Sequence, residues 1–227
     1  MKTVTAGLRA KLELLAPAMT AATTALWLPD DPELSRRYVA YLYEMHALIR
    51  ASVPLMERAA RRCARLAPSD PAAGPLGRYL ERHIDEERGH DAWLLEDMAA
   101  AGGDPVYAAR RLPSPIVADM AGAQYYWIEH HHPVALLGYI RVLEGNAPAS
   151  WLADRLAVRT GLPGAAFRTV REHAALDSGH LADLDETLDA LPPAPAHSTL
   201  LAVSALRTAA GLIGLFSQLA TTQGGPE

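Results

Sequence analysis

Two short segments of the chain repeat the same order of histidine and carboxylate side chains. The first, HIDEERGH at residues 83–90, has the order His-x3-Glu-x2-His, and the second, HAALDSGH at residues 173–180, has the order His-x3-Asp-x2-His. Residues four and seven positions apart lie on one face of an α-helix, so each segment would present three polar groups together. Imidazoles and carboxylates are ligands that suit iron. The spacing therefore predicts two metal-binding helical segments.

Two isolated glutamates lie in otherwise apolar helical segments. Glu44 lies in YVAYLYEMHALI, and Glu144 lies in PVALLGYIRVLEG. An unpaired carboxylate at a core-facing position costs roughly several kcal/mol, which pairing or metal coordination would remove. Along the chain, each lone glutamate precedes one carboxylate-x-x-His pair, which is the pattern of di-iron carboxylate sites in helical bundles. The predicted metal ligands are Glu44, Glu87, His90, Glu144, His173, Asp177 and His180.

A third carboxylate-x-x-His pair, Glu129 and His132, differs from the other two because a proline follows it directly. His132 precedes Pro133, and a residue before proline avoids the α-helical region. We therefore expect Glu129 and His132 not to share a helical face. The HHH run at 130–132 is then a polar helix end or lines the mouth of a pocket.

The elements that must position these ligands are all predicted to be helices. Ala, Leu, Arg and Glu dominate the sequence, and strand-like alternation is absent. Pro54 should bend or split a long segment that ends near Leu66, and one helix should run from after Pro75 to about Ala101. Gly102 and Gly103 should close that helix, Ser114-Pro115 should start another, and Ser198 should cap the last one. Further helices are expected at 134–144, before Thr160, and at about 165–191.

The length and composition predict an all-α fold with one domain. The chain has 227 residues, of which 50% are hydrophobic, and seven or eight helices would form a single bundle. We expect one domain over 1–227, with a ligand-bearing core at about 30–190 and a closing helix at about 198–221. The last apolar stretch contains Ser204, Arg207 and Gln218, so a core helix is favoured over a membrane span.

The charge and the cysteine content narrow the class of protein. A net charge of −5 and a pI of about 6.0 argue against a nucleic-acid-binding protein. Cys63 is the only cysteine, which suits a reducing compartment, and Glu13 interrupts the apolar region that a signal peptide would need. We therefore expect a cytoplasmic protein without a membrane or nucleic-acid partner.

Four segments resemble those of the heme-oxygenase-like diiron oxidases and oxygenases, often described as iron-containing redox enzymes. YEMHALIRAS, DEERGHDAWLLEDM, LLGYIRVLEGNAP and the final His-x3-Asp-x2-His are similar to that family's ligand-bearing segments, and the resemblance covers roughly residues 30–190. His173 favours this family over a plain ferritin-like site, which has no use for a histidine four residues before the second carboxylate. The resemblance implies a bundle of about seven helices.

The resemblance leaves two ligand choices open. Some members place the carboxylate of the second ligand segment seven residues before its histidine, and that position here is His83. His83, Glu86 and Glu87 therefore compete, and we prefer Glu87 because its spacing to His90 matches the later pair. Glu44 is also open, since some members use six ligands. Gly89, beside His90, would let a ligand helix flex or would allow close helix packing.

The function that the resemblance implies is O₂ activation at two Fe(II) ions, with O₂ as co-substrate. The expected enzyme is an oxidase or oxygenase of specialised metabolism that acts on a small organic molecule, amino-acid-like or amine-containing. Its reaction would be N-oxygenation, desaturation or carbon–carbon cleavage. Manganese in place of iron, an external electron donor and a homodimer are left open. Tyr125, Tyr126, Trp127 and Tyr139 are candidates for lining the pocket, although packing explains each of them more simply.

Three other enzyme classes compete with this interpretation. An HD-type metal phosphohydrolase would use His46, His90 and Asp91, but would leave the 173–180 segment without a role. A cofactorless relative of the thiaminase II or pyrroloquinoline-quinone synthesis type has the same fold, and the thiaminase would need Cys63 as a nucleophile. A heme oxygenase would use His46 as an axial ligand and leave the other candidate ligands unexplained.

Overall fold

The computed structural model describes residues 3–27, 31–192 and 194–221, leaving aside the side chains of 177 and 178. Over these residues the secondary structure is helical, with no strand, so the all-α prediction is confirmed. The helices are α1 (Val4–Leu12), α2 (Ala16–Trp27), α3 (Leu34–Ile49), α4 (Ser52–Leu66), α5 (Ala73–Glu87), α6 (His90–Ala100), α7 (Pro105–Arg110), α8 (Pro115–His130), α9 (Ala135–Glu144), α10 (Leu152–Thr160), the 3-10 helix η1 (Gly164–Phe167), α11 (Arg168–Ala190) and α12 (Pro195–Thr221).

The helices are more numerous than predicted, partly because two long segments are split. The first split separates α3 from α4 at Arg50 and Ala51, so that Pro54 lies in the first turn of α4, where a missing N–H has no consequence. The second split, at Arg88 and Gly89, corrects the prediction of one continuous helix to Ala101. Gly89 has a φ of 93°, in the left-handed region that glycine adopts without strain.

The predicted helix ends are partly confirmed. Ser114 accepts a hydrogen bond from the Val117 N–H (3.4 Å) and Pro115 is the first residue of α8. Gly102, with a φ of 82°, follows the end of α6. The cap at Ser198 is wrong, because α12 already begins at Pro195 and the Ser198 N–H donates to the Ala194 carbonyl within the helix.

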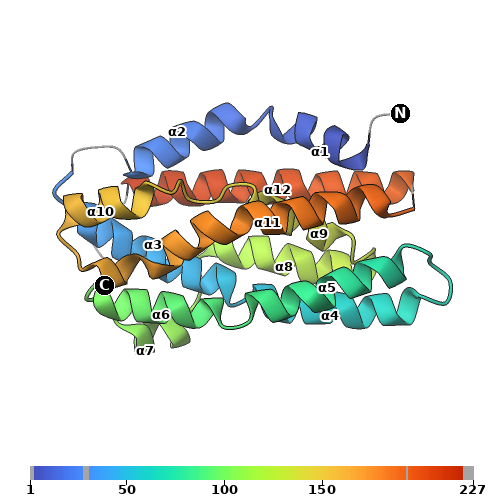
Figure 1. Cartoon of the computed structure of the whole chain (residues 1–227), viewed down its shortest axis with the longest axis horizontal. Helices are drawn as coiled ribbons and strands as arrows, with labels where there is room; N and C mark the ends of the chain where they lie inside the picture. The colour runs from blue at the N-terminus through green and yellow to red at the C-terminus, as the bar shows by residue number, and fades with distance from the viewer. Residues whose placement is uncertain (1–2, 28–30, 193, 222–227) are drawn as a thin grey trace.

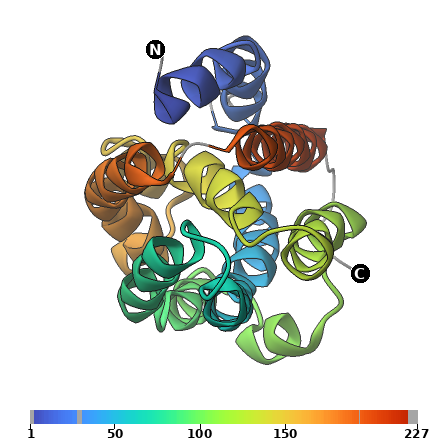
Figure 2. The same cartoon turned by 90° about the vertical axis from the view of Figure 1, so that its right-hand side faces the viewer.

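Helix α9 lies at the centre of the bundle, as the end-on view in Figure 2 shows. Almost every residue of α9 is buried, including the ligand candidate Glu144. α11 and α12 run beside it, and α4 pairs with α5. In Figure 1, α5 and α6 follow one another along the same side of the bundle, while α1 and α2 lie over α12. The central helix therefore faces several of the elements that carry the other ligand candidates.

Helix α12 is long and apolar enough, by length and composition, to cross a membrane. Half of its most apolar stretch is buried against the rest of the protein. Its close packing on α9 depends on Gly138, where a Cβ atom would lie 2.4 Å from the Leu201 carbonyl oxygen. α12 therefore packs closely against the central helix, and its assignment as a core helix instead of a membrane span stays a prediction.

Candidate metal centre

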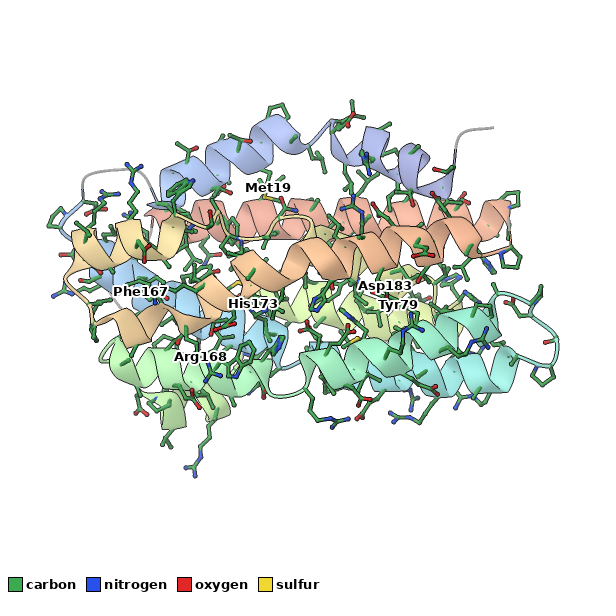
Figure 3. The ribbon with its side chains drawn as sticks, in the orientation of Figure 1. Met19, Tyr79, Phe167, Arg168, His173 and Asp183 are labelled. Atoms are coloured by element: carbon green, nitrogen blue, oxygen red, sulfur yellow. The ribbon has the colours of Figure 1, made fainter. Side chains whose placement is uncertain are left out.

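Five of the seven predicted ligands lie, together with His83, in two adjacent groups of one carboxylate and two imidazoles. One group holds His83 of α5, Glu144 of α9 and His180 of α11, and the other holds Glu87, His90 and His173. Within each group, one donor atom from every residue lies within 4.8 Å of the others. Both groups draw on α5 or the α5–α6 junction and on α11, whose residue His173 lies in the middle of the bundle in Figure 3.

In the first group, the buried His83 ring contacts two carboxylates. Its Nε2 lies 2.8 Å from Oε1 of Glu144, and its Nδ1 lies 3.1 Å from Oε2 of Glu86. The His180 ring meets His83 edge-on, with 5.1 Å between the ring centroids, and places its Nδ1 3.7 Å from the Glu144 oxygen. Three helices thus direct their polar groups to one point.

The second group forms where α5 ends and α6 begins. Glu87 is the last residue of α5 and His90 the first of α6, and Oε2 of Glu87 lies 3.1 Å from Nδ1 of His90. Gly89, with its left-handed backbone, separates the two helices, and the side chains of Glu87 and His90 meet across this break. The His173 ring lies edge-on to His90 with centroids 5.2 Å apart, and its Nδ1 donates to the Thr169 carbonyl (2.9 Å). That bond leaves Nε2 of His173 as the nitrogen with a free lone pair.

A carboxylate on α6 holds α11 in the register that this group requires. Asp97 is fully buried and accepts hydrogen bonds from the backbone N–H groups of Arg168 (3.2 Å) and Thr169 (2.8 Å), at the start of α11. Burial raises the pKa of Asp97, although these hydrogen bonds oppose the shift. The contact fixes His173, one turn further along α11, relative to His90.

Glu87 joins the two groups. While Oε2 contacts His90, Oε1 of the same carboxylate lies 3.6 Å from Nδ1 of His180 in the first group. A carboxylate with its two oxygens directed to different ligand groups is suited to bridging two cations. The arrangement therefore matches a site for two metal ions better than two unrelated sites.

Several donor atoms in the centre are buried without a hydrogen-bonding partner. Oε2 of Glu144 and Nδ1 of His180 are in this state within the described part of the chain. Oε1 of Glu144 has one close contact, with Nε2 of His83 at 2.8 Å. Buried polar atoms of native proteins are nearly always satisfied, so these atoms fit a bound cation. The donor set, of imidazoles and carboxylates, fits iron.

The surroundings of Glu144 raise its pKa, whereas those of Glu87 lower its pKa. Burial raises the pKa of Glu144, against the lowering effect of His83 and His180. Burial also acts to raise the pKa of Glu87, but the hydrogen bond and charge of His90, with His83 and His173, outweigh it and lower the pKa. Among described residues, Glu87 is thus the carboxylate that the surrounding imidazoles hold most firmly in its charged form.

The pKa values of two of the histidines also move in opposite directions. Burial acts to lower the pKa of His83, but the contacts with Glu144 and Glu86 raise it to about 9. Burial lowers the pKa of His173, which therefore remains neutral at neutral pH. A neutral imidazole is the form that binds a metal ion, so a cation in the first group would have to displace the Nε2 proton of His83.

One of the seven predicted ligands is not in these groups, and a second lies outside the part of the structure whose side chains are described. Glu44 belongs to neither, because its Oε1 accepts a hydrogen bond from Arg111 (2.9 Å), whose guanidinium also lies over the Tyr43 ring. The Asp177 side chain lies outside the described part of the structure, although its place in α11 is between His173 and His180. The other five predicted residues are brought together.

Sequence reasoning preferred Glu87 over two neighbours that the structure also places at the centre. His83 is a full member of the first group, and Glu86 lies 3.1 Å from its ring. The signal for His83 was present, because it stands seven residues before His90 and therefore on the same face of a straight helix. The preference for Glu87 as the carboxylate ligand of this segment stays a prediction.

A cavity of about 480 Å³ extends from the candidate centre. His83, Glu87, Glu144 and His173 contribute to its wall, and no lysine, arginine or aspartate among the described residues does so. The rest of the wall is mainly apolar, with hydroxyl groups from α2, Ser52, Tyr139 and Thr169. Of the four aromatic candidates, only Tyr139 lines the cavity, whereas Tyr125 and Tyr126 are exposed on α8.

A third group of histidine and aspartate lies outside this centre. Asp70, His132 and His197 meet where the α4–α5 loop, the α8–α9 loop and the start of α12 come together. Nε2 of His132 lies 2.9 Å from Asp70, and the His132 and His197 rings stack with centroids 4.1 Å apart. Glu129 instead pairs with Arg58, so Glu129 and His132 are separated as expected.

The His132 ring is held in a tautomer that does not suit a metal. Its Nδ1 accepts a hydrogen bond from the Val134 N–H (3.1 Å), so in the neutral ring the proton is on Nε2, the atom that faces Asp70. The His197 ring stacks on His132 and places its Nε2 3.9 Å from the same Asp70 oxygen. This group is therefore a structural contact between three elements.

The sequence of residues 47–211 matches the model of a protein family described as iron-containing redox enzymes. This region is more than half of the chain and contains all the members of the two ligand groups. The chain belongs to this family. No protein with a curated description matches the chain by sequence.

Solved structures place the fold of this family member among heme oxygenase-like proteins. A domain of unknown function with a heme oxygenase-like fold from Shewanella denitrificans is similar over 93% of this chain and 89% of its own, with 14% identity and a TM-score of 0.74. A TenA homolog from Pseudomonas syringae has 13% identity and a TM-score of 0.67, with 93% and 92% coverage. A CADD-like protein of unknown function from Nostoc punctiforme has 14% identity and a TM-score of 0.60, with 89% and 96% coverage.

The geometry weakens the competing enzyme classes. Cys63 is buried, burial raises its thiol pKa to about 12, and the residue does not line the cavity, so it cannot act as a thiolate nucleophile there. His46 is buried but belongs to none of the three groups and does not line the cavity either. The TenA likeness therefore shows a shared fold only.

Proposed function

We propose that this protein is a non-haem diiron oxidase or oxygenase that uses O₂ to oxidise a small organic molecule. The observation that carries the proposal is the pairing of two carboxylate–imidazole groups, linked through Glu87, on the wall of one cavity. Two imidazoles and one carboxylate form the ligand set of many non-haem Fe(II) oxygenases, in which other coordination positions remain open. Membership of an iron-containing redox enzyme family supports the same metal.

The roles of the residues follow from their positions. Glu144 and His180 would hold one ion, and Glu87, His90 and His173 the other, with Asp177 as a further candidate. Fe(II) supplies the electrons for O₂ reduction when it is bound. The buried surroundings of Glu144 and His90 keep water away from the reacting molecules, and the cavity wall holds the substrate beside the carboxylates.

The cavity wall favours a substrate with a mainly apolar body. An amino-acid-like or amine-containing molecule was expected, and its charged groups would need partners. The charged partners that the described wall offers are at the candidate metal centre. We therefore propose that the polar or charged group of the substrate lies at the Glu87 and His173 end, with an apolar chain against residues such as Ile140, Leu212 and Phe216.

Anaerobic loading with Fe(II), followed by exposure to O₂, tests the proposed function. We expect two bound iron ions per chain, O₂ uptake that depends on bound iron, and oxidation of at least one compound in a panel of alkyl amines and carboxylic acids. His180→Ala should lose at least one ion, with His130→Ala, at an exposed position, as the matched control. Fewer than two ions in the wild type, or unchanged binding in His180→Ala, would refute the proposal.

A further inference from the structure

The first ligand group contains a histidine, His83, that the predicted ligand set did not include. The pattern of di-iron sites in helical bundles predicted Glu44 as a ligand, and the family resemblance left that prediction open. In the structure Glu44 faces Arg111, and it does not line the cavity. His83 instead lines the cavity and stands within 2.8 Å of Glu144.

The His83 ring is oriented as metal-bound histidines usually are. Glu86 lies 3.1 Å from Nδ1 and accepts its proton, which leaves Nε2 as the nitrogen that faces Glu144 and the interior of the group. A carboxylate on the far nitrogen is the common support of a metal-ligating histidine. Tyr79 stacks nearly parallel on the ring (20° between planes, centroids 5.4 Å apart) and restricts its rotation.

An ion pair between His83 and the glutamates does not account for the whole group. That pair would leave Nδ1 of His180 and Oε2 of Glu144 buried without a partner. A cation between the three side chains would satisfy all of these atoms together. With His83 included, moreover, both groups consist of one glutamate and two histidines.

We propose that His83 is a ligand of the metal ion in the first group and that Glu44 is not a ligand. The inference rests on the proposed diiron function. It assigns Glu86 the role of a positioning residue, which acts on the metal through His83. It also assigns Glu44 and Arg111 a structural role, in which a buried carboxylate is balanced by a protein cation and not by iron.

Metal counting on three proteins tests the inference without any measurement of activity. The wild type, His83→Gln and the double variant Glu44→Gln/Arg111→Met are loaded with Mn(II) and analysed for bound metal and by electron paramagnetic resonance. Glutamine resembles the shape of histidine but is a poor metal ligand, and the double variant removes both partners of the Glu44 pair together. We expect two ions with a spin-coupled signal in the wild type and the double variant, and one ion with an isolated six-line signal in His83→Gln.

The outcomes separate this inference from the function on which it rests. A wild type that binds fewer than two ions ends the proposed function itself. A wild type with two ions, together with a His83→Gln variant that also holds two at unchanged affinity, overturns the role of His83 alone. Loss of one ion in the folded Glu44→Gln/Arg111→Met variant also overturns the inference, because Glu44 would then be needed for metal binding.

A second variant covers the case in which His83→Gln does not fold. His83→Ala leaves space for a free imidazole, so the count is repeated with and without added imidazole. Recovery of the second ion and of the coupled signal with imidazole supports the inference. Two ions without imidazole, or no recovery with it, contradict the inference. Circular dichroism confirms that each variant is folded before metal is added.

Discussion

Residue by residue, the buried histidines of this protein differ in what limits their protonation. At His132, the lone pair of Nδ1 is already used by the Val134 N–H, and the ring lies against His197. Burial, followed by the charges of His197 and Arg62, lowers the pKa of His132, while Asp70 opposes the shift. The described neighbours therefore hold His132 in its neutral form.

This arrangement predicts a loss of stability on acidification. The folded-state pKa of His132 is below the ordinary value of about 6.5, so the unfolded chain binds more protons as the pH falls below that value. The contribution of His132 is thus fully present above about pH 6.5 and decreases as the pH falls towards the folded-state pKa. The loss from this one group is at most about 1.4 kcal/mol per pH unit.

Urea unfolding of the wild type and His132→Asn at about pH 7.5 and about pH 5.5 measures this effect. The asparagine oxygen can still accept the Val134 N–H but does not titrate. We expect the free energy of unfolding to change less with pH in His132→Asn than in the wild type. Equal changes in the two proteins would show that His132 does not contribute.

Among the elements, the junction between α5 and α6 determines the geometry of the second ligand group. Gly89 has a φ of 93°, and it separates the helix that ends with Glu87 from the helix that begins with His90. A Cβ atom at Gly89 would meet no neighbour, so close packing is not the reason for this glycine. The reason is the backbone conformation, which L-residues with a side chain rarely adopt.

Replacing Gly89 with Ala should destabilise the protein by about 1–2 kcal/mol. The same change should weaken metal binding, because relaxation of the strain would move His90 relative to Glu87. Gly122→Ala is the matched control, since Gly122 lies within α8 with open space around it, and alanine there should stabilise the protein by up to about 1 kcal/mol. Thermal unfolding and metal titration check both effects, and equal behaviour of the two variants would contradict the prediction.

The same junction shows what the sequence could predict and what it could not. Residue types, their order and their helical periodicity were enough to bring His90, Glu144, His173 and His180 into one proposal. Periodicity assumes a straight helix, however, and could not reveal the turn at Gly89. Nor could it reveal that Glu44 pairs with Arg111, which is 67 positions away, because periodicity does not tell which neighbouring helix a face will meet.

Over the whole molecule, the charged groups of the cavity wall are concentrated at one end. The described wall holds its glutamates and histidines at the candidate metal centre, and its remaining side chains are neutral. Several of these come from α2, including Thr23. The shape and polarity of this neutral part should therefore decide which molecules bind.

A charge introduced on α2 should change ligand binding without changing metal binding. In Thr23→Glu, the new carboxylate would lie on the wall of the cavity, away from the candidate ligands. We expect binding of alkyl carboxylates, measured by calorimetry on the metal-loaded protein, to weaken by about tenfold or more, since a buried unpaired charge is unfavourable. The metal count should stay at two.

Ala21→Glu, on the exposed side of the same helix, is the control and should bind these compounds as the wild type does. Similar weakening of ligand binding in both variants would indicate a general effect of negative charge, and Thr23 would then not belong to the binding surface. A change in the number of metal ions bound by Thr23→Glu would contradict the prediction that this part of the cavity wall affects ligand binding alone.

The position of α2 in the chain has an evolutionary consequence. The family model matches residues 47–211, so α2 and part of α12, which also contributes to the wall, lie outside the matched residues. Mutations in these flanking helices would change the pocket without changing any member of the two ligand groups. Such changes would present a different molecule to the same metal ligands.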